Sequence, residues 1–102
     1  MAQFDVFVNP VASARAGFPF VVSMQSDLAR NPREQIIAPV SVRGALGSGS
    51  LTPKIAIQGF DHIVFVPRLR VMESRVLTAY VCSVVSARLQ LLAAIDLLFF
   101  GV

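Results

Sequence analysis

Prolines and glycines interrupt the first two thirds of the chain so often that only short elements are expected there. All six prolines lie at or before Pro67, and every glycine but Gly101 lies at or before Gly59. Proline lacks a backbone donor and glycine favours turns, so both limit the length of regular structure. Neither residue occurs between Arg68 and Phe100. The pattern predicts a mainly β chain with a single α-helix near the C-terminus.

The interrupted part contains short apolar runs that are typical of strands. In the first run Phe4, Val6 and Val8 alternate with other residues, which places them on one face. Further strands are expected over residues 18–24, 35–42 and 70–77, and a hairpin over 54–58 and 61–66 that turns at Gly59-Phe60. Short strands followed by one late helix indicate a small closed or nearly closed barrel.

The size and composition favour one small domain, residues 1–102, that is partly covered by a second copy or a partner. Hydrophobic residues make up 55% of the chain and charged residues only 15%. A chain this short builds only a modest core, so part of this apolar surface is expected to lie in an interface. The net charge is +3, but the basic residues are scattered. A nucleic-acid interface usually clusters them, so we interpret them as ordinary surface charges.

The lone cysteine, Cys82, argues against an internal disulfide framework and a cysteine zinc site, and favours a reducing compartment. The N-terminus lacks the basic and apolar regions of a signal peptide. The longest uncharged run near the C-terminus covers residues 76–87, which is shorter than the roughly 20 residues a spanning helix needs. We therefore expect a cytoplasmic protein without a membrane span.

Candidate catalytic groups are few. His62 is the only histidine, and the side chain of its neighbour Asp61 would point to the opposite face of a strand. His62 is therefore expected to be a structural or surface residue. Cys82 lies in an apolar run, where a thiol tends to be inert. The glycines of residues 44–50 do not have the spacing of a phosphate-binding loop. No cofactor or metal site is predicted.

The segment from Val84 to Phe100 is the most informative part of the sequence. On a helical wheel its few polar residues do not gather on one side, and apolar residues fill nearly every sector. A surface helix of a monomer should have one polar face, so this helix is expected to be buried on several sides or to dock onto a partner. Phe99 either packs back on the barrel or joins that contact. For Phe100 and Val102 we favour a partner contact.

Five segments, in the same order, resemble those of the CcdB family of toxins. They are Gln3–Phe7, Met24–Leu28, Ala38–Val40, Leu51–Gly59 and, most specifically, Ala94–Val102 with the sequence AIDLLFFGV. This resemblance implies an SH3-like barrel of the CcdB/Kid/MazF type, a homodimer with its terminal helices side by side, and no enzymatic activity.

The resemblance also implies a function. CcdB toxins bind the A subunit of DNA gyrase and trap its cleaved complex with DNA. A CcdA-like antitoxin neutralises the toxin, and the two together repress their operon by binding operator DNA. The gyrase-binding residues implied here are Asp96, Phe99, Phe100, Gly101 and Val102, and Leu28 and Ala29 form a neighbouring contact.

Two alternative functions remain open at the level of sequence. Phe100 stands where the family has tryptophan, and Asp96 stands where it has asparagine. These differences leave open a non-toxic or retargeted member that binds only an antitoxin. A MazF-like endoribonuclease on the same barrel would instead need a basic groove with an acid/base group. Arg68, Arg70 and His62 are the candidates for such a site.

Overall fold

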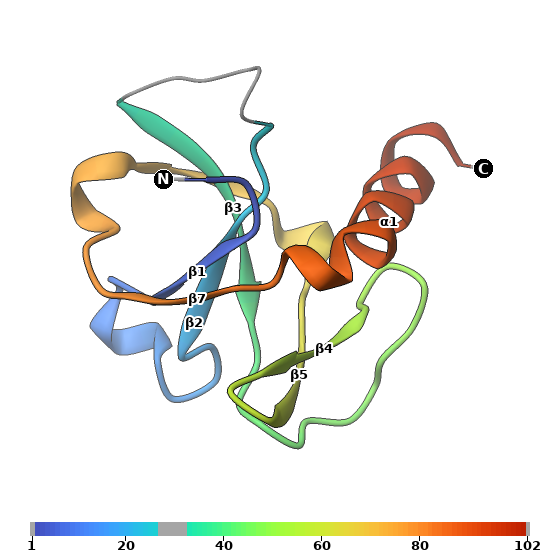
Figure 1. Cartoon of the computed structure of the whole chain (residues 1–102), viewed down its shortest axis with the longest axis horizontal. Helices are drawn as coiled ribbons and strands as arrows, with labels where there is room; N and C mark the ends of the chain where they lie inside the picture. The colour runs from blue at the N-terminus through green and yellow to red at the C-terminus, as the bar shows by residue number, and fades with distance from the viewer. Residues whose placement is uncertain (1, 27–32, 102) are drawn as a thin grey trace.

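The computed structural model describes residues 2–26 and 33–101. Its main element is a five-stranded antiparallel sheet with strand order β6-β3-β2-β1-β7 (Figure 1). The strands of this sheet are β1 (Asp5–Val8), β2 (Phe20–Ser23), β3 (Glu34–Val40), β6 (Arg70–Glu73) and β7 (Tyr80–Ser83). A second, two-stranded sheet consists of β4 (Lys54–Ile57) and β5 (Phe60–Ile63), and the chain ends in helix α1 (Arg88–Phe100). The predicted mainly β fold with a C-terminal helix is confirmed.

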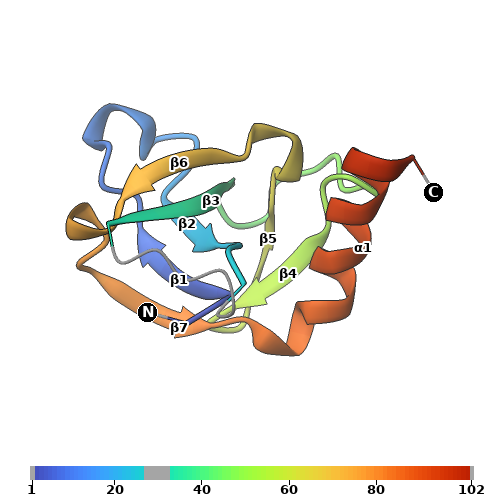
Figure 2. The same cartoon turned by 90° about the horizontal axis from the view of Figure 1, so that it is seen from above.

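The small sheet joins the large one at the end of β3. Val40 forms an isolated bridge with Val64, and the backbone N–H of Phe65 donates to the Pro39 carbonyl at 2.9 Å. Seen from above, β4 and β5 therefore lie across the space between the large sheet and α1 (Figure 2). Strands β6 and β7 remain the two edges of the large sheet. Within the described residues, the strand ladders thus do not close the predicted barrel.

Both faces of the large sheet are covered. The larger core lies between the two sheets and α1 and includes Phe4, Val6 and Val22. A smaller cluster on the opposite face includes Phe7, Val21, Ile37, Met72 and Leu77. The expected inward face of β1 is correct for Phe4 and Val6, while Val8 is half-buried. Phe7 is buried as well, because the chain around Val11 and Leu77 covers the outer face.

The predicted hairpin is present, but its turn is one residue earlier than expected. β4 and β5 pair from Lys54↔Ile63 to Ile57↔Phe60, so Gln58 and Gly59 form the two-residue loop. Both have positive φ, 52° and 86°, as a type I′ turn requires. The second strand is also shorter than predicted, because a 3₁₀ turn, η3 (Val66–Arg68), begins three residues after it.

The strand predicted over residues 70–77 is confirmed only in its first half. β6 ends at Glu73, where its partner β3 begins at Glu34, and a 3₁₀ turn, η4 (Ser74–Val76), follows. Strand β7 was not predicted; its residues pair with β1.

The helix was placed too early, from Val84. The N–H of Val84 donates to the Phe4 carbonyl at 2.9 Å, and a 3₁₀ turn, η5 (Val85–Ala87), precedes α1. Across residues 2–26 and 33–101, no helix combines the length and the apolar character needed to cross a membrane.

Candidate functional site

Helix α1 is fixed to the core along a single ridge. Leu91 and Ala94 are fully buried, and the half-buried Leu92, Ile95 and Leu98 pack beside them on the larger core. Residues spaced three, four and seven apart share one side of a helix, which explains this pattern. The ridge meets η3, where the buried Val66 belongs to the same core. The remaining sides of α1 are free for other contacts.

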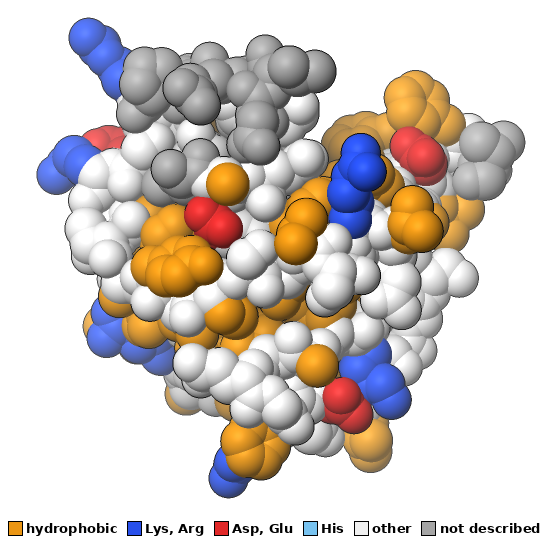
Figure 3. Space-filling view, viewed as in Figure 1, with side chains coloured by type: hydrophobic (Ala, Val, Ile, Leu, Met, Phe, Trp, Pro, Cys, Tyr) orange, Lys and Arg blue, Asp and Glu red, His pale blue; other side chains and the backbone are white. Residues whose placement is uncertain are grey.

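Those sides carry several large apolar side chains that are exposed. The exposed fraction is 80% for Leu89, 64% for Phe99 and 73% for Phe100. The prediction that the helix lacks a polar face is therefore confirmed, although only one side of it is buried. Phe99 does not pack back on the sheets. Figure 3 shows hydrophobic side chains around one acidic side chain over the end of α1, and the exposed acidic residue of this helix is Asp96.

Gly101 ends the helix immediately after the two phenylalanines. It adopts the left-handed conformation, with φ 70° and ψ 20°, and its N–H donates to the Leu97 carbonyl at 3.1 Å. An L-residue with a side chain is disfavoured there, whereas glycine is not. Phe99 and Phe100 consequently sit in the last turn of a capped helix, which limits fraying beneath the two rings.

This arrangement is suited to binding another protein. Exposed aromatic side chains on a fixed helix are typical anchors of protein interfaces. Asp96 forms no ion pair with the described residues, so a partner that covers it must supply a donor or a cation. The structure brings Asp96, Phe99, Phe100 and Gly101 together on one helix end. The other predicted site residues, Leu28, Ala29 and Val102, lie outside the described residues.

His62 is a structural histidine. Only 5% of it is exposed, and its Nδ1 lies 2.8 Å from the Ser41 carbonyl oxygen. A carbonyl oxygen only accepts, so Nδ1 must carry the proton. Asp61 lies on the exposed face of the hairpin, where its carboxylate is 4.0 Å from Lys54 Nζ. Asp61 therefore does not orient His62, as expected from the sequence.

The two arginines proposed for an RNA-cleaving site are not placed beside His62. Arg68 and Arg70 line one cavity, whereas His62 lines another. Burial raises the pKa of the Cys82 thiol above its usual value, and the Asp5 carboxylate adds to the increase, which disfavours a reactive thiolate. No cluster of three potential metal ligands occurs among the residues that the structure describes.

Leu89, the most exposed large apolar side chain of α1, was not among the residues predicted for the site. The only signal for it was the missing polar face. Compared with known protein families, residues 3–101 match the family model described as CcdB protein. A search of curated protein sequences gives no match.

Proposed function

The chain belongs to the CcdB family, whose toxins poison DNA gyrase without enzymatic activity, and we propose that it binds the gyrase A subunit through the end of α1. In this proposal Phe99 and Phe100 insert into the A subunit and trap the cleaved gyrase–DNA complex. The exposure of both rings on a capped, core-anchored helix is the observation that supports it most.

The two rings have enough apolar surface to anchor such a complex. Fully burying a phenylalanine side chain stabilises a complex by about 1.5–3 kcal/mol. Two such rings, on a helix that is already ordered, lose little conformational freedom on binding. The carboxylate of Asp96 would need a cation or a hydrogen-bond donor on gyrase. This requirement would make the contact specific for a partner that supplies such a group.

The proposal includes the partners expected of a type II toxin. Two copies would associate with their α1 helices side by side, which would cover the exposed Leu89. A CcdA-like antitoxin would neutralise the dimer in the cytoplasm, and the two together would repress their operon. Operator binding is assigned to the joint complex because the basic residues of this chain are scattered.

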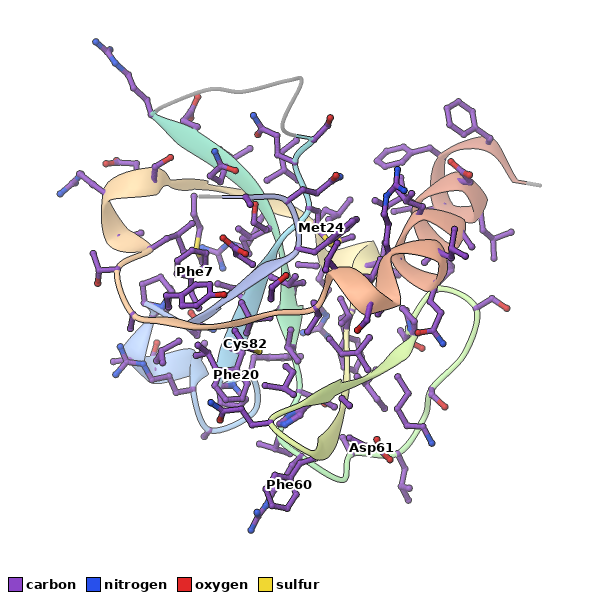
Figure 4. The ribbon with its side chains drawn as sticks, in the orientation of Figure 1. Phe7, Phe20, Met24, Phe60, Asp61 and Cys82 are labelled. Atoms are coloured by element: carbon purple, nitrogen blue, oxygen red, sulfur yellow. The ribbon has the colours of Figure 1, made fainter. Side chains whose placement is uncertain are left out.

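The test is a gyrase supercoiling and DNA-cleavage assay with increasing amounts of this protein. We expect loss of supercoiling and stabilised cleaved DNA, and we expect Phe100→Ala to abolish both effects. Phe60→Ala is the matched control, because Phe60 is 50% exposed on the hairpin at the opposite end of the molecule (Figure 4). Equal potency of Phe100→Ala and the parent protein would contradict the assigned anchor.

A second candidate function, a non-toxic or retargeted member, rests on Phe100 and Asp96. Phenylalanine lacks the indole N–H and part of the area of tryptophan, and Asp96 adds a charge where the family has an amide. If the parent protein leaves gyrase unaffected while Phe100→Trp with Asp96→Asn poisons it, the chain is retargeted. If neither protein affects gyrase but an antitoxin still binds, the non-toxic function holds.

A further inference from the structure

A cavity of about 400 Å³ lies at the turn end of the β4–β5 hairpin, which we call the hairpin cavity. Phe60 and His62, two residues apart on β5, share one face of the hairpin and both line it. Phe20, the first residue of β2, lines it from the large sheet (Figure 4). The other apolar lining residues are Pro19, Val42 and Ile57. Its volume falls in the range of about 300–1,000 Å³ that is usual for small-molecule sites.

His62 gives this cavity an unpaired nitrogen. The side chain is buried, its Nδ1 is bonded to the Ser41 carbonyl, and its Nε2 has no hydrogen-bond partner among the described residues. In the described ranges only Ser74 has a side-chain polar atom that is both fully enclosed and unpaired. The Nε2 of His62 is therefore still reachable through the cavity that His62 lines. Because Nδ1 carries the proton, Nε2 of the uncharged ring accepts, and a ligand there must donate.

Arg43 gives the cavity a positive charge that nothing balances. It is the one permanently charged group among the described residues that line the cavity. Its guanidinium lies 4.5 Å from the centroid of the Phe60 ring and forms no ion pair with residues 2–26 or 33–101. The carboxylate of Asp61 is on the opposite face of the hairpin, 4.0 Å from Lys54 Nζ. A guanidinium stacked on a ring still has its N–H edge available to an anion.

The backbone of Arg43 is fixed beside β5. On one side of Arg43, the N–H of Ser41 donates to the Ile63 carbonyl at 2.9 Å. On the other side, the N–H of Gly44 donates to the Asp61 carbonyl at 2.8 Å. The cation and the unpaired nitrogen thus come from neighbouring backbone segments that are held in register. A ligand does not have to order these segments when it binds.

The walls and the charge together define the class of ligand. The rings of Phe20 and His62 pack edge to face with centroids 5.4 Å apart, and Phe60 adds a third ring to the lining. Aromatic rings attract one another beyond the area that they bury, so an aromatic ligand suits these walls. One arginine balances the single charge of a carboxylate, but not the charge of about −1.5 to −2 on a phosphate monoester. The cavity therefore favours an aromatic carboxylate over a nucleotide.

From these observations we propose that the hairpin cavity binds a small aromatic carboxylic acid that carries a hydrogen-bond donor on its ring. The carboxylate pairs with Arg43, and the donor binds Nε2 of His62. The ligand ring packs against Phe20 and Phe60. The exposed side chain of Gln58, which also lines the cavity, is available for a further polar contact. The inference does not depend on gyrase binding, because the described residues that line the cavity include none of α1.

The test is a titration of the isotope-labelled protein with para-hydroxyphenylpropionate, followed by nuclear magnetic resonance. Phenylpropionate lacks the donor, and hydroxyphenylpropionamide lacks the charge. We expect loss of the charge to weaken binding about tenfold and loss of the donor about two- to tenfold. Arg43→Gln should weaken binding of the acid about tenfold and leave that of the amide nearly unchanged. Arg68→Gln is the matched control, because Arg68 also lies over a phenylalanine ring, Phe18 at 5.3 Å, but lines another cavity.

The ring nitrogens of His62 give a second readout in the unaltered protein, which is needed because replacing this buried residue would disturb the fold. We expect hydroxyphenylpropionate to shift the Nε2 resonance, and phenylpropionate to leave it nearly unchanged. The methyl signals of Val42 and Ile57 should shift with both acids. Equal affinity for the three compounds, equal loss in the Arg68→Gln control, or shifts confined to α1 would each overturn the proposal. The absence of saturable binding would do the same.

Discussion

Replacing Leu91 with alanine should destabilise the protein far more than the same change at Leu89, two residues away on α1. Leu91 is fully buried in the larger core beside Val66 and Val84, whereas Leu89 is 80% exposed. The substitution removes about three buried carbon groups at Leu91, at about 0.8 kcal/mol each. The cavity left behind adds to this loss, so we expect a decrease in unfolding free energy of about 2.7–5 kcal/mol.

That loss is large for a domain of this size, whose total stability is expected to be about 5–15 kcal/mol. Urea unfolding followed by circular dichroism would measure it as a lower midpoint with an unchanged slope. For Leu89→Ala we expect a change within about 0.5 kcal/mol at low protein concentration. Similar losses for the two variants under those conditions would refute the single-ridge attachment of α1. A Leu89→Ala loss that grows with protein concentration would instead reveal the proposed dimer contact.

Three further predictions concern single residues outside that ridge. Gly101→Ala should weaken the helix cap by about 1 kcal/mol, because φ is 70° there, and lower the fractional helicity seen by circular dichroism. Ser41→Ala should lower the unfolding free energy by about 1–3 kcal/mol in urea titrations, because the buried N–H of Ile63 loses its acceptor, Ser41 Oγ at 2.9 Å. Alkylation of Cys82 should require a higher pH than for a free cysteine, since burial and then Asp5 raise its pKa. Asp5→Asn should move that pH profile downward, and an unmoved profile would contradict the assigned effect of Asp5.

Much of the fold could be predicted from the sequence because several local sequence patterns agree with the tertiary structure. Residues 54–63 alternate around a glycine, and this pattern correctly predicted the β4–β5 hairpin. Its turn was misplaced by one residue because Gln58 adopts a positive φ. That conformation is uncommon for a residue other than glycine, so the residue type did not indicate it. The helix was recognised from a long segment without proline or glycine. These features depend on residues close to one another in the chain.

The errors occurred where distant backbone partners decide the structure. Tyr80–Ser83 became a strand because β1 offers a free edge, and β1 lies more than seventy residues earlier. Glu73 ends β6 because its partner strand begins at Glu34. For the candidate site, Phe100 was identified as exposed, whereas Leu89 was not singled out.

The attachment of α1 through one ridge has an evolutionary consequence. Substitutions at Leu91 or Ala94 endanger folding, whereas those at Leu89, Asp96 or Phe100 change the exterior without disturbing the core. Selection can therefore alter what this end of the molecule recognises at little risk to the fold. A lineage that pursues a changing target would diverge first at these outward positions, while the inward ones stay nearly constant.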